Sequence, residues 1–268
     1  MFKINDFQTG LKIGQGSFAV VKRCVHKASG HVLALKTYDK KTLNNQVATT
    51  NLHREIFVLA TLKHPNIMSL YEVIDSRTHV HLVMELCQGT NLFHIIKKRK
   101  PDQRLPEPEA AQVFRQIVSS VAYMHSLNVV HRDIKLDNIL TKVDNKGNHH
   151  IKLIDFGFAT GCPPDEKLTN TCGTPHYMDP DLVKKAPYNG HAADVWALGV
   201  LLFILTTGKL PFYAAFEGDL YRKIQSGRYQ FPNDMIEKDG SSYNPSQSLK
   251  NLIRKILEPN ANLRITCE

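Results

Sequence analysis

The sequence predicts an α+β protein with two lobes: a small lobe built on an antiparallel β-sheet with one main helix, and a larger, mainly α-helical lobe. Short β-prone runs separated by turn residues fill the first third of the chain. Helical periodicity dominates from Leu92 onward, and Cys87-Gln88-Gly89 interrupts the pattern between the two regions. We expect a small lobe over residues 1–84, a joint over residues 85–89 and a large lobe over residues 90–268, forming a single domain without a regulatory tail.

The small lobe is predicted from its alternating strands and one helix. The runs LKIGQG, AVVKRCVH and HVLALKTY are β-prone and are separated by turn residues. A helix is expected over roughly Asn51–Leu62, and it should end before His64-Pro65 because the residue before a proline avoids helical geometry. Two further strands are expected over Met68–Asp75 and His79–Glu85.

The large lobe is predicted from two helices of different character. In Glu109–Ser126 the apolar residues Val113, Ile117 and Val121 are four apart, which indicates an amphipathic helix that faces a core. Asp194–Thr206 is apolar on almost all sides, as expected for a helix at the centre of a lobe. This run is shorter than the roughly 20 residues that cross a bilayer, so we expect no membrane span.

Composition narrows the function classes only partly. Hydrophobic residues make up 42% and charged residues 22%, as in ordinary globular proteins. The five scattered cysteines lack zinc-site spacing, and the start of the chain lacks a secretory signal, so we expect a reducing compartment, the cytoplasm or also the nucleus. The net charge of +9 permits nucleic-acid binding. However, the longest basic run ends at Pro101 and has no interleaved aromatic residues, so we expect no nucleic-acid partner.

A glycine-containing loop and a strand lysine suggest a phosphate site. GQGSFAVV starts at Gly14, and its two glycines allow close approach of the backbone to phosphates, although such a pattern taken alone is more often a simple hairpin turn. The loop lacks the GK[ST] ending of P-loop NTPases and is followed by a strand, unlike a dinucleotide-binding fingerprint. Ala34 and Lys36 share one face of a strand, which leaves room for a flat ring beside a cation.

Two later motifs indicate what this loop and lysine do. HRDIKLDN, over residues 131–138, and DFG, over residues 155–157, match HRDLxxxxN and DFG in the expected order. The chain therefore resembles the eukaryotic protein kinase family over essentially its whole length. DFGFA, CGTPHYM and LEPNANLRIT resemble most closely the calcium/calmodulin-dependent and AMP-activated group. Lys135, two positions after Asp133, is typical of the serine/threonine branch.

The resemblance implies an ATP- and Mg²⁺-dependent transfer of phosphoryl groups to serine or threonine hydroxyls of protein substrates. It implies that Asp155 and Asn138 bind the metal, because hard Mg²⁺ prefers oxygen ligands. It implies that Asp133 orients the attacking hydroxyl and accepts its proton, and that Lys135 steadies the terminal phosphate.

The resemblance also implies a nucleotide site. Lys36 should hold the α and β phosphates and be braced by Glu55. The loop that should cover the phosphates comprises Gly14, Gly16, Ser17, Phe18 and Ala19, of which Ala19 replaces the third glycine. The adenine site should be formed by Ile13, Val21 and Ala34 as its roof, Leu140 as its floor, Met84 at its back, and backbone groups of Glu85 to Cys87.

The segment 155–181 resembles an activation segment. Thr174 should contact Asp133 and Lys135 as structural support. Arg132 implies a loop that phosphorylation by an upstream kinase can order, since arginine binds phosphate bidentately. The usual acceptor position is Asn170, so either flanking threonine, Thr169 or Thr171, can serve, with Thr171 preferred. A loop that is active without phosphate is the alternative.

Some positions depart from the family pattern. Asp181 stands where a glutamate is expected; we expect it to pair with Arg264, and its shorter side chain predicts a less stable lobe. Asp194 should anchor the backbone of the catalytic loop. Asn91 and Ile204 occupy positions where basophilic relatives keep acids, which predicts a weak preference for basic residues upstream of the acceptor, with Asp137 still present. A pseudokinase that serves as a scaffold is the alternative function, but Lys36, Asp133 and Asp155 are all retained.

Overall fold

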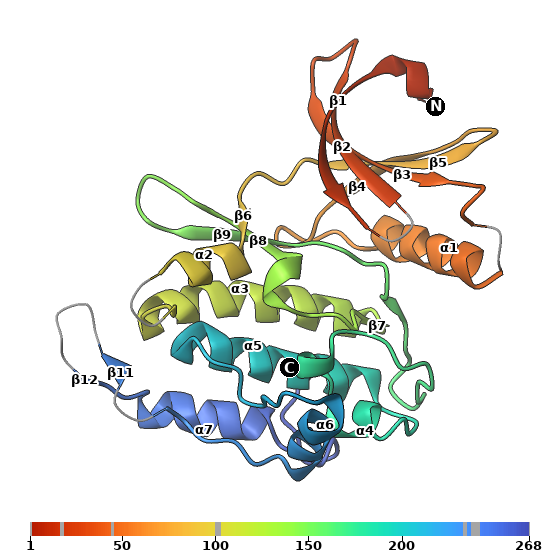
Figure 1. Cartoon of the computed structure of the whole chain (residues 1–268). Helices are drawn as coiled ribbons and strands as arrows, with labels where there is room; N and C mark the ends of the chain where they lie inside the picture. Colours follow the sequence, from red (N-terminus) through yellow and green to blue (C-terminus); the bar gives the residue numbers. More distant parts are fainter. Residues whose placement is uncertain are drawn as a thin grey trace. The chain divides into compact units, whose positions relative to one another are not determined.

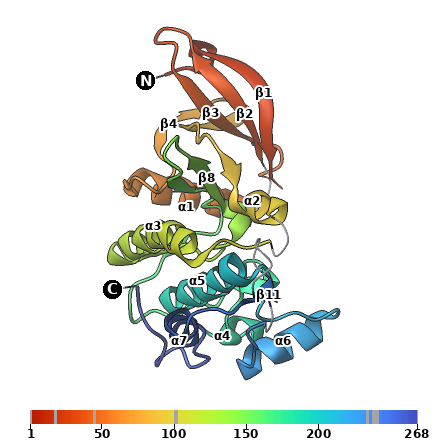
Figure 2. The same ribbon diagram turned by 90° about the vertical axis from the view of Figure 1, so that its left-hand side faces the viewer.

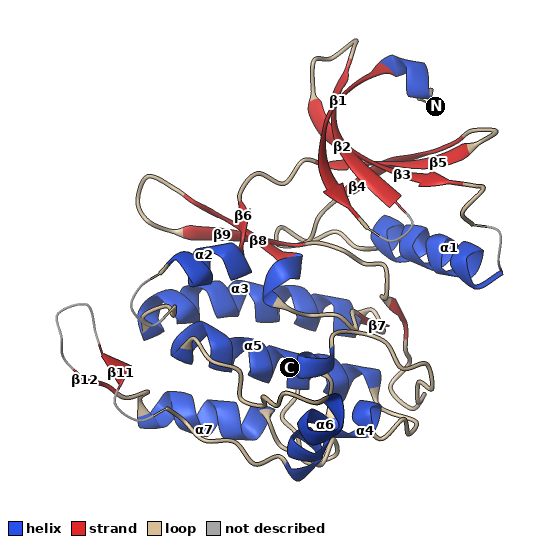
Figure 3. Ribbon diagram, in the orientation of Figure 1, coloured by secondary structure: helices blue, strands red, loops and turns tan. Residues whose placement is uncertain are grey.

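The computed structural model describes residues 2–16, 19–43, 46–99, 103–232, 235–236 and 242–267. The chain divides into two compact units, Met1–Gln88 and Gly89–Glu268 (Figure 1). The division falls within the segment 85–89 that the sequence predicts as a joint, and each unit is described by itself below. The α+β class is confirmed, with an antiparallel sheet in the first unit and a mainly helical second unit (Figure 3).

The first unit is built on a five-stranded antiparallel sheet with strand order β1-β2-β3-β5-β4. Its strands are β1 (Phe7–Gln15), β2 (Ala19–His26), β3 (Val32–Asp39), β4 (Leu70–Asp75) and β5 (His79–Glu85). The register pairs Val21 with Lys36 and Ala34 with Met84, so these four side chains share one face of the sheet. The opposite face carries a core of Phe7, Cys24, Leu35, Ile74 and Val83.

Helix α1 (Gln46–Thr61) is the main helix of the first unit, and a short 3-10 helix η1 (Ile4–Asp6) precedes β1. The helix begins five residues before the predicted start at Asn51. Ala48, Leu52, Glu55 and Leu59 are buried at heptad-like spacing along one face. The first turn contributes only Ala48 to this face, so its polar sequence hid the helix start.

The second unit consists mainly of helices, as predicted. They are α2 (Leu92–Lys98), α3 (Glu107–Ser126), α4 (Pro180–Val183), α5 (Gly190–Thr207), α6 (Glu217–Ser226) and α7 (Gln247–Ile256). Helices α3 and α5 lie side by side, and α7 lies against α5 (Figure 2). Gly199 allows this close approach, because a Cβ there would lie 2.7 Å from Ile256 Cγ2. Helix α5 has the length and hydropathy of a membrane span, but 89% of it is buried within the protein, as in the core helix of a globular unit.

The second unit also holds short strands that the sequence analysis did not predict. One sheet has the order β6-β8-β9, formed by Thr90–Asn91, Ile139–Val143 and His149–Leu153. The others pair β7 (Val129–Val130) with β10 (Thr160–Gly161), and β11 (Met235–Ile236) with β12 (Ser242–Tyr243). The 3-10 helices η2 (Leu136–Asn138) and η3 (Pro175–Tyr177) complete the described elements. In the sequence, the HRD motif lies between β7 and β8, and the DFG motif lies between β9 and β10.

Candidate active site

The predicted pair of Lys36 and Glu55 is present in the first unit. Lys36 Nζ donates to Glu55 Oε1 at 2.6 Å, joining β3 to α1. The side chains are 16% and 4% exposed, so the pair is shielded from water. Tyr38, which the sequence analysis missed, donates its hydroxyl to the other carboxylate oxygen of Glu55 at 2.5 Å. Its position two residues after Lys36, on the same face of a strand, is the signal that could have identified it.

The glycines of the loop between β1 and β2 are not required by packing within the first unit. A Cβ added at Gly14 would come no closer than 3.6 Å to another atom, and one at Gly16 no closer than 3.9 Å. Gly16 N–H donates to Ala19 O at 2.9 Å. The predicted loop residues Ser17 and Phe18 lie outside the described residues.

The predicted adenine residues are divided between the two units. Val21, Ala34 and Met84 share the Lys36 face of the sheet, and Ile13 is 52% exposed on β1. Leu140 lies on β8 of the second unit. In the segment 85–87, the Glu85 N–H donates to Ser69 O at 2.9 Å, and the Glu85 carbonyl accepts from Cys87 Sγ at 3.9 Å.

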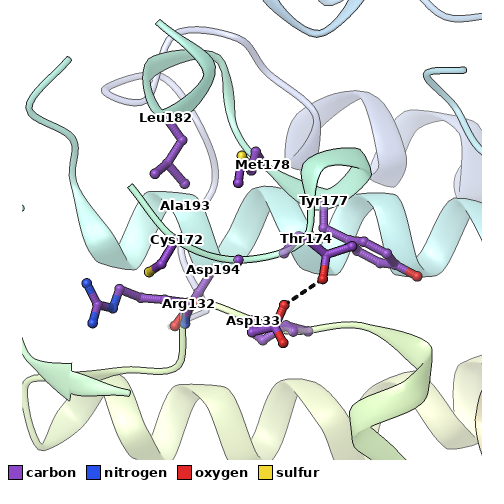
Figure 4. Close-up of a pocket in the computed structure, with 12 residues that line it drawn as sticks. Arg132, Asp133, Cys172, Thr174, Tyr177, Met178, Leu182, Ala193 and Asp194 are labelled. Atoms are coloured by element: carbon purple, nitrogen blue, oxygen red, sulfur yellow. Dashed lines mark hydrogen bonds between the residues drawn. The ribbon is translucent and has the colours of Figure 1, made fainter. Parts of the chain in front are cut away.

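Asp133 is the centre of a buried polar cluster in the second unit. Its Oδ2 lies 2.7 Å from Lys135 Nζ and accepts from Asn138 Nδ2 at 3.0 Å. Its Oδ1 accepts from the Thr174 hydroxyl at 2.8 Å (Figure 4). The Thr174 hydroxyl in turn accepts from Lys135 Nζ at 2.9 Å. The contact predicted between Thr174 and both catalytic-loop residues is therefore present. The Asp133 carboxylate is fixed in orientation by three side chains.

Asp194 holds the backbone of the catalytic loop, as predicted. Its Oδ2 accepts from His131 N–H at 2.8 Å, and its Oδ1 accepts from Arg132 N–H at 2.8 Å. Arg132 has a φ of 66°, in the left-handed region, which the two bonds stabilise. Burial alone would raise the pKa of Asp194, but its interactions with His125 and His131, including the hydrogen bond from the His131 N–H, outweigh burial and lower this pKa below its ordinary value. Asp194 therefore remains charged and fixes the start of the loop.

The DFG segment lies next to the catalytic loop in the second unit. Ile154 N–H donates to Asn138 O at 2.9 Å, which brings Asn138 and Asp155 to adjacent parts of the backbone. Asp155 has a φ of 65° and an exposed side chain. The buried rings of His131 and Phe156 lie 5.0 Å apart and pack the two motifs together. Burial lowers the pKa of His131 below its ordinary value, so this ring is neutral.

The activation segment lies against the catalytic loop at Gly173. This glycine has a φ of 101°, and a Cβ there would lie 2.6 Å from Arg132 O, so only glycine fits. Arg132 and Cys172 line the same small pocket (Figure 4). Arg132 Nε donates to Phe158 O at 2.7 Å. The candidate acceptors Thr169 and Thr171 are both exposed.

The prediction that Asp181 pairs with Arg264 is wrong. Arg264 Nη1 bonds instead to Asp179 Oδ2 at 3.2 Å, and both side chains are fully buried. Asp181 is partly exposed and lies 3.6 Å from Lys184 Nζ. Asp179 is the N-cap of α4 and accepts from Leu182 N–H at 2.9 Å, which aims its other oxygen at Arg264. The short side chain of Asp181 therefore costs the second unit no buried ion pair.

Two of the three residues expected to read a substrate, Asp137 and Ile204, line one groove of the second unit, whereas Asn91 does not. Phe93, Asp137, Ile204 and Leu210 all contribute to it. The Asn91 side chain lies at the start of α2, where it accepts from His94 N–H at 3.0 Å as the N-cap. Its amide therefore serves the helix end. Ile204 is buried and contributes apolar surface to the groove.

Comparison with known proteins agrees with this geometry. The family model described as "Protein kinase domain" matches residues 7–268. The chain is 37% identical over 267 residues to CBL-interacting protein kinase 24 of Oryza sativa subsp. japonica, covering 99% of this chain and 55% of that protein. It is 36% identical over 273 residues to the probable serine/threonine-protein kinase KCC4 of Saccharomyces cerevisiae, covering 98% of this chain and 25% of that protein.

A human relative supports the same placement. The chain is 38% identical over 256 residues to human NUAK family SNF1-like kinase 1, covering 96% of this chain and 36% of that protein. The chain thus spans about half or less of the length of these relatives, and the match to SNF1-like kinases confirms the predicted group. The chain belongs to the protein kinase family and is a serine/threonine protein kinase domain.

Proposed function

We propose that this domain is an active enzyme that transfers the γ-phosphoryl group of Mg·ATP to serine or threonine hydroxyls of protein substrates. The observation that carries the proposal is the Asp133 cluster. Three side chains orient a buried carboxylate whose partners Lys135, Asn138 and Thr174 are all retained. Phosphoryl transfer depends mostly on positioning and charge neutralisation, which such a preorganised cluster supplies.

The residues present fit ATP and Mg²⁺, which protein kinases use generally. Gly14 and Gly16 leave space that a Cβ would fill, so a phosphate could approach their backbone. Asp155 offers an exposed carboxylate and Asn138 an amide oxygen. No group of three or more His, Cys, Asp or Glu that could hold a metal occurs within the part of the chain that the structure describes. Mg²⁺ fits the oxygen ligands that Asp155 and Asn138 offer, because it binds through one or two side chains together with phosphates and water.

In this proposal each residue has a defined task. Mg²⁺ neutralises the phosphate charge when bound. Lys36 binds the α and β phosphates, and Lys135 binds the terminal phosphate. Asp133 accepts a hydrogen bond from the substrate hydroxyl, orients it and takes its proton. Thr174 keeps Asp133 and Lys135 at a fixed separation.

The test compares wild type with Asp155→Ala in the transfer of labelled phosphate from ATP to a generic protein. We expect transfer by the wild type, and a loss of at least about a hundredfold in the variant, because the metal loses a carboxylate ligand. A wild type that binds ATP but transfers no phosphate would favour a scaffold role. Asp179 forms the buried ion pair with Arg264, so the shorter side chain of Asp181 does not by itself support that role.

We further propose that the substrate groove has a weak preference for basic residues upstream of the acceptor. Asp137 supplies one exposed carboxylate, whereas Phe93, Ile204 and Leu210 supply apolar surface. A peptide library tests this proposal; a strong upstream arginine requirement would contradict it. Ile204→Glu should raise the selectivity for upstream arginine by about tenfold through a charge-assisted hydrogen bond, and Ile204→Gln, its neutral control, should not.

Regulation through the activation segment is also part of the proposal. Tyr188 Oη donates to Asn170 O at 3.2 Å, which holds the backbone at Asn170 in place. The exposed Thr169 and Thr171 flank this residue. An upstream kinase would phosphorylate Thr171, and Arg132 would bind the phosphate. Mass spectrometry of active enzyme in which both threonines are unmodified would contradict this regulation. We propose a cytoplasmic location, which fractionation of cells that express the tagged chain would test.

A further inference from the structure

Tyr38 completes a three-residue cluster around Glu55 within the first unit. Its Oη donates to Glu55 Oε2 at 2.5 Å, while Lys36 Nζ donates to Glu55 Oε1 at 2.6 Å. Lys36 Nζ also lies 5.4 Å from the centroid of the Tyr38 ring. Both oxygens of the Glu55 carboxylate therefore have a donor, and each donor comes from the same face of β3.

The cluster is buried, so its hydrogen bonds are hard to replace. Tyr38 is 6% exposed and Glu55 is 3% exposed, which leaves water little access to either group. Burial, reinforced by the negative charge of Glu55, raises the pKa of Tyr38 well above its ordinary value, against the opposing effect of Lys36. The phenol therefore stays protonated and is a permanent donor. Without it, Glu55 Oε2 would lose the donor that offsets its burial.

We propose that Tyr38 is a positioning residue for Lys36, which it fixes by holding Glu55 at both carboxylate oxygens. The terminal torsion of a glutamate is soft, so a carboxylate held at one oxygen can rotate about it. A carboxylate held at both oxygens presents a fixed acceptor to the lysine. This inference rests on the proposed role of Lys36 in phosphate binding, and it adds the residue that sets the position of that ammonium group.

The first experiment removes one oxygen atom and measures binding without catalysis. Tyr38→Phe and wild type are titrated calorimetrically with Mg·ATP and, separately, with adenosine, which has no phosphates. We expect the affinity for Mg·ATP to fall by about tenfold, in line with one hydrogen bond to a charged group, and that for adenosine to change by less than about twofold. An equal loss of affinity for both ligands would overturn the proposal, as would an unchanged affinity for Mg·ATP.

The chain offers a matched control. Tyr221 Oη donates to Glu217 on the exposed surface of α6, which is the same pair of groups outside the nucleotide site. Tyr221→Phe should bind both ligands as the wild type does. Melting temperatures of both variants show whether removing a tyrosine hydroxyl alters folding. Tyr38→Leu is the second variant if Tyr38→Phe does not fold; failure of both to fold would assign the tyrosine a purely structural role and overturn the proposal.

A double-mutant cycle then asks whether Tyr38 acts through Glu55. Glu55→Met keeps an unbranched side chain but removes the carboxylate. In that background Tyr38→Phe should weaken Mg·ATP binding no further, because the group it positions is gone. Losses of Mg·ATP affinity that add independently for the two substitutions would overturn the proposal. A wild type that binds Mg·ATP but does not phosphorylate proteins would contradict the proposed function alone, since the affinities would still decide the role of Tyr38.

Discussion

At the scale of single residues, the pair formed by Asp179 and Arg264 shows how a fold can relocate an ionic contact. Arg264 also donates to Ala192 O at 2.6 Å and Glu258 O at 2.8 Å, and its guanidinium lies 4.9 Å from the Trp196 ring centroid. Burial raises the pKa of Asp179 and lowers that of Arg264, with each partner opposing the shift of the other. Such a buried pair is most costly when only one partner is removed.

Asp179→Asn should therefore lower the free energy of unfolding of the second unit by about 3 kcal/mol, because it leaves the Arg264 charge buried and unpaired. Asparagine keeps the N-cap of α4, which isolates the effect of charge. Asp181→Asn is the control and should cost no more than about 0.5 kcal/mol, since its contact with Lys184 is partly exposed. Urea unfolding measures both; a larger loss for Asp181→Asn would contradict the assignment.

His81 makes the stability of the first unit depend on pH. Burial, with a smaller effect of His79, lowers the pKa of His81 below the ordinary value of 6.5. The unfolded chain therefore binds a proton at this histidine more readily than the folded chain does. The contribution of neutral His81 to the stability of the first unit is complete above pH 6.5 and is lost as the pH falls below it. His81→Gln should reduce the variation of the free energy of unfolding with pH between about pH 7.5 and 5.5. An unchanged pH profile would show that His81 does not titrate in this way; exposed His53→Gln is the control.

At the scale of elements, the activation segment and the catalytic loop act as one structural piece. Gly173 lets the segment approach the Arg132 carbonyl, and Thr174 then bridges Asp133 and Lys135. The family resemblance predicted this contact, because it places a threonine at this position of the activation segment. The strands β8 and β9, which lead from one motif to the next, were not predicted, since β8 is a run of only five residues whose last two are both exposed and show no alternation.

Thr174→Val should lower kcat by about ten- to a hundredfold, because it removes the hydroxyl that orients Asp133 and leaves Lys135 without this acceptor. Thr174→Ser keeps the hydroxyl and should retain most of the activity. Initial rates at saturating Mg·ATP and peptide measure both variants. If valine and serine reduced kcat equally, the hydrogen bonds of this residue would not be what matters.

At the scale of the whole molecule, ligand binding should couple to stability. Mg·ATP at a hundred times its dissociation constant should stabilise the folded chain by about 2.7 kcal/mol by mass action. Thermal unfolding with ATP alone and with ATP plus Mg²⁺ measures this stabilisation. Asp155→Asn should remove most of the additional stabilisation that Mg²⁺ provides and leave the stabilisation by ATP alone. The net charge of +9 should not lead to retention on DNA at physiological salt, which a gel shift checks.

The sequence by itself determined the family and the α+β class and predicted which residues carry the chemistry, because motif residues recur in fixed order and the apolar periodicity of long helices is a local property. Only the tertiary structure decided which acid pairs with Arg264, that Tyr38 reaches Glu55, and that Asn91 serves a helix end. These contacts join residues whose separation in space depends on how helices and strands pack. Spacing along β3 places Tyr38 on the same face as Lys36, but which carboxylate each side chain reaches is decided by how α1 packs against the sheet.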